Sequence, residues 1–302
     1  MKLAGILDPI ARTVWSAAFA SIGRAAYSRG ALPIPFGGQS ILVIAPHPDD
    51  ETLGCAGTIL MHVRSGDAVC LAFVTDGAQS RAGGLAPEIM RQHRQREAEA
   101  AAASMRVARF EWFGLPEGRW SCEELSDPLL DVLRRTSPHV IYVPSRVDFH
   151  PEHHKVAHCL ARLIAGPGII PADTGVRVYP LQVPLTPLLG NRIVDCSSVW
   201  AGVLAAMSVY ATQSANVGRA LRMRRYAALS HGLTRYGEEF WQMSASSYSR
   251  LHGAPPHQWR TTCFRGIRYR SFSDPLAYLS GIRERRRLKR SAEDSGRTLQ
   301  EG

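Results

Sequence analysis

The chain has 302 residues, of which 45% are hydrophobic and 21% charged, and this composition excludes a disordered protein, a collagen-like chain and a coiled coil. The length accommodates one large α/β domain with extensions or two modest domains. The formal net charge is +10, but much of the excess lies in a basic run at residues 283–290, which we interpret as a solvent-exposed helix end. The net charge therefore does not by itself indicate a nucleic-acid-binding protein.

Apolar residues recur at helical spacing in the N-terminal arm and predict an amphipathic helix that ends before Gly30. Asp8, Pro9, Arg12 and Arg24 interrupt this stretch, so it can neither span a membrane nor serve as a signal peptide. Its apolar stripe consists of Leu7, Ile10, Val14, Trp15, Phe19 and Ile22. We expect the stripe either to pack on the domain or to lie in a membrane interface as a peripheral contact.

Six cysteines are spread along the chain without a C-x-x-C pair, and several lie in apolar runs, where a thiol behaves as a small buried hydrophobe. We therefore expect a reducing, cytoplasmic location, peripheral to the inner membrane if the N-terminal helix binds lipid. Lys2, Lys155 and Lys289 are the only lysines, and this dominance of arginine suits a GC-rich bacterial genome.

Short apolar, β-branched runs alternate with helical segments along the middle of the chain. Strands are predicted at 41–45, 69–75, 110–113 and 140–143, and helices at 58–64, 87–105 and 123–135. Residues 176–183 and 192–194 extend the sheet, and residues 199–210 and 218–230 are helical. This alternation predicts an α/β fold with a Rossmann-like, mainly parallel sheet flanked by helices. We expect one domain at 38–245, an N-terminal helix and linker at 1–37, and a C-terminal extension with a basic tail at 246–302.

A polar cluster, His47-Pro48-Asp49-Asp50-Glu51, directly follows the first strand and precedes a helix. In an open α/β sheet, ligands gather outside the carboxyl ends of the strands, where this loop lies. Three acids and an imidazole in five positions repel one another at a structural turn, whereas a divalent cation turns the carboxylates into ligands. The alternative is an Asp-rich turn that caps the next helix.

A second cluster, residues 148–154, follows the strand at 140–143 and contains Asp148, His150, Glu152, His153 and His154. Histidine and carboxylate donors suit Zn²⁺, and three protein ligands with an open position are typical of hydrolytic zinc sites. The topology predicts that both clusters meet at one edge of the sheet, although a His-rich polar turn remains the alternative for this cluster. We expect His158, farther along, to face solvent or a neighbouring helix.

The two clusters resemble those of the LmbE/PIG-L family of zinc-dependent N-deacetylases, and the resemblance covers about residues 39–241. It implies a Rossmann-like fold and N-acetylglucosaminyl conjugates as substrates. Shorter similar motifs are Thr75-Asp76-Gly77, Arg94 with Glu97 and Ala101, Met105-Arg106-Val107, Leu115-Pro116-Glu117-Gly118, Val194-Asp195, Tyr210 with Thr212-Gln213-Ser214, and Tyr236-Gly237-Glu238-Glu239-Phe240.

The resemblance also implies roles for individual residues. His47, Asp50 and His153 are the implied zinc ligands. Asp49 is the implied general base, which takes a proton from the zinc-bound water that acts as nucleophile. His150 is the implied group that stabilises the oxyanion and protonates the leaving amine. Glu152 stands where the family has an aspartate, which lengthens that side chain by one methylene.

The function expected from these observations is a zinc-dependent hydrolase that removes the N-acetyl group from an N-acetylglucosamine-type amino-sugar conjugate. The substrate partner is either a small molecule or a lipid-linked amino sugar. One rival is a metal-dependent amidase that acts on a non-sugar amide. A second rival is a nucleotide- or nucleic-acid-binding protein, but no G-x-G-x-x-G follows the first strand and no basic patch carries interleaved aromatics, so we expect no specific nucleic-acid partner.

Overall fold

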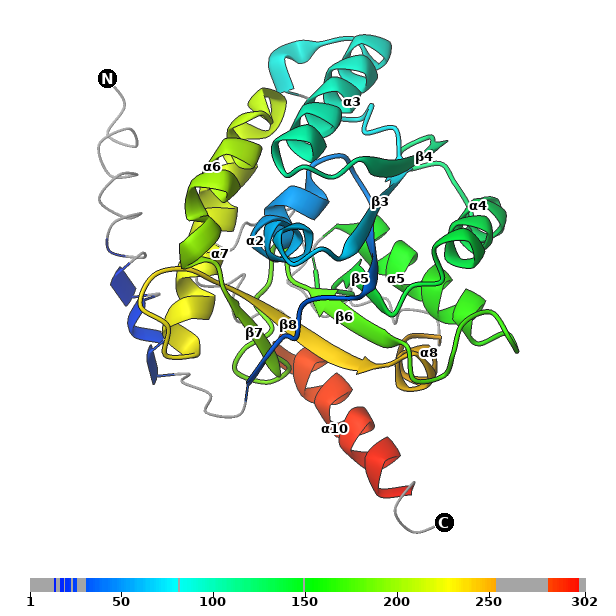
Figure 1. Ribbon diagram of the computed structural model, residues 1–302, viewed down its shortest axis with the longest axis vertical. Helices are drawn as coiled ribbons and strands as arrows, with labels where there is room; N and C mark the ends of the chain where they lie inside the picture. Colours follow the sequence, from blue (N-terminus) through cyan, green and yellow to red (C-terminus); the bar gives the residue numbers. More distant parts are fainter. Residues whose placement is uncertain are drawn as a thin grey trace.

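The computed structural model describes residues 31–80, 82–148, 150–253 and 282–298, together with scattered positions between residues 14 and 25. Its described residues form one α/β sheet domain (Figure 1). The strands are β1 Leu32–Pro33, β2 Ser40–Ala45, β3 Ala68–Thr75, β4 Arg109–Leu115, β5 Val140–Pro144, β6 Gly175–Tyr179, β7 Arg192–Asp195 and β8 Gly237–Ser244. The helices are α2 Asp50–Arg64, α3 Pro87–Ser104, α4 Cys122–Thr136, α5 Pro151–Ile164, α6 Trp200–Ser208, α7 Ser214–Ser230, α8 Ala245–His252 and α10 Ile282–Thr298.

The sheet is mostly parallel, as the sequence predicts. Its order is β1-β7-β8-β6-β5-β2-β3-β4, and β8 alone of these strands runs antiparallel to both of its neighbours. From β2 the chain continues through β3 and β4 on one side, whereas β5 and β6 lie on the other side. The boundary between β2 and β5 is therefore a topological switch point, where open α/β sheets form their ligand crevice.

Helices cover both faces of the sheet (Figure 1). Helices α4, α5 and α8 pack over one face around a core that includes Leu42 and Ile141. Helices α2, α3, α6 and α7 cover the other face around a core that includes Val43 and Tyr142. Because β2 and β5 are buried on both faces, their sequences are continuously apolar rather than alternating.

The strand β8 was not predicted, because two glutamates interrupt its apolar pattern. Both are buried and hydrogen-bonded. Glu238 accepts hydrogen bonds from the Gly57 amide at 2.9 Å and from Arg224. Glu239 accepts from the Leu185 amide at 2.8 Å. Tertiary partners thus allow acidic side chains inside a central strand, which a local pattern cannot reveal.

The expectation of unpaired cysteines is wrong for one pair. Cys122 at the start of α4 and Cys159 in α5 form a disulfide with their Cα atoms 5.3 Å apart and a sequence separation of 37. The packing of α4 against α5 brings these residues together, and no local spacing signals it. Cys55, Cys70 and Cys196 are free and buried, as expected.

The basic run is largely solvent-exposed, as the sequence predicts, but one of its arginines is buried. Within α10, Arg285 and Leu288 are buried, and the Arg285 guanidinium donates to the Pro184 and Thr186 carbonyl oxygens at 2.8 and 3.1 Å. Arg286 and Lys289 are exposed. The helix is therefore amphipathic and packs on the domain beside α8.

The N-terminal helix lies largely outside the described residues. The described positions between 14 and 25 are helical, and Val14 is 63% exposed. Leu7, Ile10, Trp15 and Phe19 lie outside the described residues, so the surface that covers this stripe stays a prediction, as do the domain boundaries. Across the described part of the chain, no helix combines the length and the apolar composition that a membrane crossing requires.

Candidate metal centre and active site

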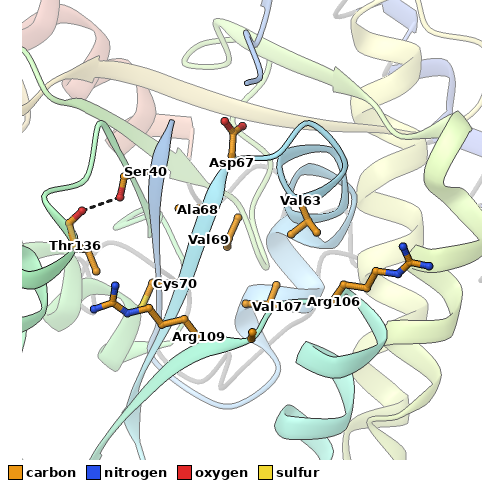
Figure 2. Close-up of a pocket in the computed structure, with 11 residues that line it drawn as sticks. Ser40, Val63, Asp67, Ala68, Val69, Cys70, Arg106, Val107, Arg109 and Thr136 are labelled. Atoms are coloured by element: carbon orange, nitrogen blue, oxygen red, sulfur yellow. Dashed lines mark hydrogen bonds between the residues drawn. The ribbon is translucent and has the colours of Figure 1, made fainter. Parts of the chain in front are cut away.

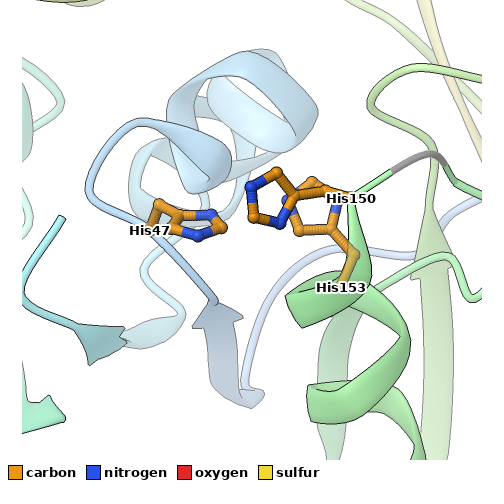
Figure 3. A group of neighbouring side chains, drawn as sticks. All are labelled: His47, His150 and His153. Atoms are coloured by element: carbon orange, nitrogen blue, oxygen red, sulfur yellow. The ribbon is translucent and has the colours of Figure 1, made fainter. Parts of the chain in front are cut away.

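The two predicted clusters meet at the switch point. His47 lies in the loop after β2, whereas His150 and His153 come from the start of α5, after β5 (Figure 3). The ring centroids of His47 and His150 are 4.4 Å apart, and those of His150 and His153 are 5.0 Å apart. The three histidines each offer a ring nitrogen within 4.8 Å of the others.

Asp50, the first residue of α2, joins two of these histidines. Its Oδ2 atom is 3.0 Å from Nδ1 of His47 and 3.2 Å from Nε2 of His153. All three side chains are buried. One carboxylate oxygen therefore lies between two imidazole nitrogens that come from different strand ends.

The second nitrogen of each imidazole faces another carboxylate. Nε2 of His47 is 2.6 Å from Oε2 of Glu152, and Nδ1 of His153 is 3.2 Å from Oδ2 of Asp148. Metal-binding histidines typically pair their other nitrogen with a carboxylate in this way, which fixes the tautomer and the ring orientation. The donor set of two imidazoles and one carboxylate suits Zn²⁺. The residues present therefore fit a zinc ion.

The electrostatics of the cluster also favour a cation. Burial opposes protonation of His47, but the Asp50 and Glu152 carboxylates outweigh it and raise the pKa of His47 to about 9. Burial likewise opposes protonation of His153, yet Asp50 and Asp148 raise its pKa. The carboxylates of the cluster thus favour positive charge on the two imidazoles, which protons supply. A bound divalent ion would displace them.

Asp49 lies beside the cluster in a strained conformation. Its φ of 144° is outside the regions that L-residues prefer, and such strain concentrates at functional sites. Nη2 of Arg94, from α3, donates to Asp49 Oδ1 at 2.6 Å and to the Pro48 carbonyl oxygen at 2.5 Å. Burial raises the pKa of Asp49 to about 6, although Arg94 opposes the shift. The Arg94 guanidinium therefore holds the Asp49 carboxylate next to the candidate ligand Asp50.

His150 caps the N-terminus of α5, where its Nδ1 accepts from the Glu152 amide at 3.3 Å. Burial, with His47 and His153 close by, lowers the pKa of His150 to about 2. The imidazole is therefore neutral and carries one N–H group. Farther along α5, Nδ1 of His158 is 3.1 Å from the His252 carbonyl oxygen, so it faces the neighbouring helix α8, as expected.

Several supporting residues have no role assigned from the sequence. Arg94 belongs to one of the shorter similar motifs, and the structure shows that it holds Asp49 in place. Asn216, in α7, donates to Asp49 Oδ2 at 3.4 Å. Glu97 accepts from the Thr212 amide at 2.8 Å and thereby ties α3 to the segment that precedes α7. No local signal identifies Asn216, because only the packing of α7 brings it to a loop 167 residues earlier.

A polar groove of about 330 Å³ lies next to the cluster. Glu117 belongs to its lining, and Oε1 of Glu117 is 3.7 Å from Nε2 of His47. The other lining residues are mostly polar or charged and include Asp76, Gln79, Glu88, Arg91 and Arg119. Such a lining offers hydrogen-bond donors and acceptors to a polar ligand.

Another cavity, of about 300 Å³, lies at the opposite edge of the sheet (Figure 2). Ser40, Ala68 and Arg109, the first residues of β2, β3 and β4, line it. Because the strands are parallel, their first residues lie at the edge opposite His47. This cavity is therefore separate from the candidate metal centre.

Residues 42–164 match the PIG-L family model, described as GlcNAc-PI de-N-acetylase. This match contains both histidine clusters. The matched residues, about two fifths of the chain, are therefore similar to the LmbE/PIG-L family. A curated relative, 1D-myo-inositol 2-acetamido-2-deoxy-alpha-D-glucopyranoside deacetylase 2 of Saccharopolyspora erythraea, is 26% identical over 172 residues, which are 47% of this chain and 62% of that protein. The corresponding deacetylase of Kineococcus radiotolerans is 24% identical over 66% of this chain and 65% of its own length. The chain thus spans less than two thirds of either relative.

Solved structures share this fold. The N,N'-diacetylchitobiose deacetylase of Pyrococcus horikoshii aligns with a TM-score of 0.61 and 21% identity, over 73% of this chain and 88% of that chain. GalB, the 4-carboxy-2-hydroxymuconate hydratase of Pseudomonas putida, aligns with a TM-score of 0.56 and 22% identity, over 70% and 96%. At these identities the alignments show the fold alone, and this fold carries more than one reaction.

Proposed function

We propose that this protein is a zinc-dependent hydrolase that removes the N-acetyl group from an N-acetylglucosamine-type amino-sugar conjugate. The observation that carries the proposal is the Asp50 carboxylate shared by His47 and His153, with Asp49 held beside it by Arg94. The match to the PIG-L family model and the names of the curated deacetylases support the same reaction class. The polar groove beside His47 supports a hydroxyl-rich substrate.

In this proposal His47, Asp50 and His153 hold the metal. When bound, zinc supplies a Lewis acid for the acetamide carbonyl and lowers the pKa of a water molecule toward ~7. Glu152 and Asp148 keep the two imidazoles oriented through their second nitrogens. The site therefore combines ligands from two strand ends with an oriented outer layer of carboxylates.

Asp49 acts as the general base. Its Oδ1 atom is held at 2.6 Å by Arg94, whereas Oδ2 has only the longer 3.4 Å contact from Asn216, so Oδ2 takes the proton from the attacking water. A bond forms between the water oxygen and the carbonyl carbon, and the C–N bond then breaks to give acetate and a free amine. Asp49 then returns the proton that it took from the water to the amine nitrogen.

His150 stabilises the oxyanion that develops on the carbonyl oxygen. Because its imidazole is neutral, it donates one N–H hydrogen bond from a partly buried position, where such a bond is stronger than in water. Its ring lies against those of His47 and His153, which keeps the donor beside the proposed metal ligands.

Acetate release from a panel of conjugates tests the proposal. The panel contains N-acetylglucosaminyl-inositol, N,N'-diacetylchitobiose, N-acetylglucosaminyl-phosphatidylinositol as the lipid-linked member, and simple N-acyl amides as controls. We expect zinc-dependent acetate release from at least one sugar conjugate and none from the simple amides. Release from the simple amides alone would replace the proposal with the amidase alternative. No release from any member, with zinc bound stoichiometrically, would contradict deacetylation of these substrates.

A further inference from the structure

The carboxylate that supports His47 is itself held by a segment outside both histidine clusters. Oε1 of Glu152 accepts hydrogen bonds from Nε1 of Trp120 at 2.7 Å and from the Gly118 amide at 2.6 Å. Its other oxygen, Oε2, is 2.6 Å from Nε2 of His47. One glutamate side chain therefore links the Trp120 indole to a proposed metal ligand. The side chain is longer than the aspartate of the family by one methylene.

The Trp120 indole is itself fixed in place. Its side chain is only 3% exposed and belongs to the core beneath α4 and α5. Nζ of Lys155, from α5, lies 4.0 Å from the centroid of the Trp120 ring and also donates to the Trp120 carbonyl oxygen. Two residues later, the Cys122–Cys159 disulfide ties the same segment to α5. The indole N–H thus has a defined direction before any ligand binds.

We propose that Trp120 is a positioning residue of the metal centre, acting through Glu152 on His47. With Oε1 held by the indole, Oε2 accepts the proton on Nε2 of His47, so the Nδ1 lone pair beside Asp50 is directed to the metal. This inference rests on the proposed zinc site. It is independent of which amino sugar is cleaved.

The substitution Trp120→Phe tests the proposal with little other change. Phenylalanine keeps an aromatic ring in the core beside Lys155 but removes the single N–H donor and alters no charge. The matched control is Trp112→Phe, because Nε1 of Trp112 is buried with no hydrogen-bond partner among the described residues, while its ring stacks on Phe73. Any general effect of losing an indole is therefore present in the control.

The readout is the zinc dissociation constant, measured by competition with a chelator of known affinity. Loss of an outer-layer partner typically weakens metal binding by ~10–100-fold. We expect Trp120→Phe to weaken zinc binding by about 10-fold and Trp112→Phe to change it by less than about two-fold. Zinc affinity of Trp120→Phe within about two-fold of wild type would overturn the proposal.

A double-mutant cycle distinguishes positioning from general destabilisation. If Trp120 acts through Glu152, adding Trp120→Phe to Glu152→Gln should weaken zinc binding no further, because the linking carboxylate is already lost. Equal additional losses in both backgrounds would contradict this route.

The tautomer of His47 in the zinc-loaded wild-type protein, read from its ring ¹⁵N chemical shifts, provides a test that needs no folded variant. A proton on Nε2 is expected, and metal on Nε2 would overturn the proposal.

The same measurements separate failure of this inference from failure of the proposed function. If His153→Ala abolishes zinc binding but Trp120→Phe does not alter it, the data support the proposed metal site and contradict the positioning role of Trp120. If Trp120→Phe weakens zinc binding but no sugar conjugate is deacetylated, the data support the positioning role of Trp120 and contradict the proposed substrate class.

Discussion

At the residue scale, the centre depends on a single carboxylate oxygen that faces two imidazoles. Asp50 Oδ2 lies within 3.2 Å of ring nitrogens from His47 and His153. Because these side chains are buried, the remaining proposed ligands stay close together when one is removed. Two donors are nevertheless too few for tight zinc binding.

We predict that His153→Ala loses stoichiometric zinc and all turnover, because one of three proposed ligands is absent. The metal content of purified protein by plasma emission spectrometry checks this. His158→Ala is the control, since His158 is on the same helix and faces α8. Wild-type zinc affinity in both His153→Ala and Asp50→Ala would contradict the ligand assignment.

We predict that Asp49→Asn keeps zinc but loses activity. The amide preserves the shape of the side chain but cannot take a proton, and removal of a general base typically costs ~10²–10⁴-fold in rate. The measurement is the acetate-release rate together with zinc content, with Asp173→Asn at an exposed position as the control. Loss of zinc from a folded Asp49→Asn protein would reclassify Asp49 as a ligand.

At the element scale, the approach of α2 to the sheet depends on small residues. A Cβ atom at Gly54 would lie 2.4 Å from the Tyr179 ring, and that ring is fixed because its hydroxyl donates to the Ile44 carbonyl oxygen at 2.7 Å. Helix α2 therefore packs against the sheet only because its inner face lacks side chains at this position. The packing places Asp50 at the end of β2.

We predict that Gly54→Ala destabilises the protein by about 1–3 kcal/mol, the usual cost of overpacking a rigid core. Gly218→Ala is the matched control, because Gly218 is also helical and its Cβ would meet only the end of Arg222 at 3.8 Å. There alanine should be neutral or stabilising by up to about 1 kcal/mol through helix propensity. Urea unfolding of both variants measures the difference, and equal stabilities would contradict the packing argument.

The Cys122–Cys159 disulfide joins α4 to α5 across a sequence separation of 37. We predict that the double substitution Cys122→Ser, Cys159→Ser lowers the free energy of unfolding by about 2–4 kcal/mol, since the unfolded chain regains the freedom that the cross-link removes. Urea unfolding of wild type with and without a thiol reductant checks the size of the effect. Alkylation of both cysteines in unreduced, denatured wild-type protein would show that the bond is absent.

At the scale of the whole molecule, buried histidines make stability depend on pH. Burial lowers the pKa of His62 to about 4 and of His252 to about 3. In the unfolded chain these groups bind protons below about pH 6.5. The unfolded state therefore takes up protons first, and the free energy of unfolding falls as the pH drops from about 6.5 toward 4.

We predict that His62→Gln reduces this pH dependence by up to one proton, or about 1.4 kcal/mol per pH unit. Urea unfolding of the zinc-loaded protein between about pH 7 and pH 4.5 measures the slope, which is independent of any constant loss of stability caused by the substitution. His93→Gln, at an exposed position on α3, should keep the wild-type slope. An unchanged slope in His62→Gln would contradict the role assigned to its burial.

Short segments of the sequence were enough to predict most of the sheet and the edge at which the two polar clusters lie, whereas the roles of the proposed ligands came from the family resemblance. The apolar runs that became β2 and β5 are buried on both faces and therefore leave a continuous signal, and the polar clusters follow them directly. Parallel strands end at one edge, so His47 and His153 could be placed together from their positions after these strands. Each of these signals is local, because it depends on neighbouring residues in the chain.

The groups that support the site depend instead on tertiary packing. The contact of Arg94 with Asp49, the link from Trp120 through Glu152 to His47, and the Cys122–Cys159 disulfide join residues that lie 32 to 105 positions apart in the sequence. The two glutamates buried in β8 likewise depend on partners from distant elements. A buried polar group is stable only when its partners are present, and those partners are supplied by packing, which no local pattern of residues encodes.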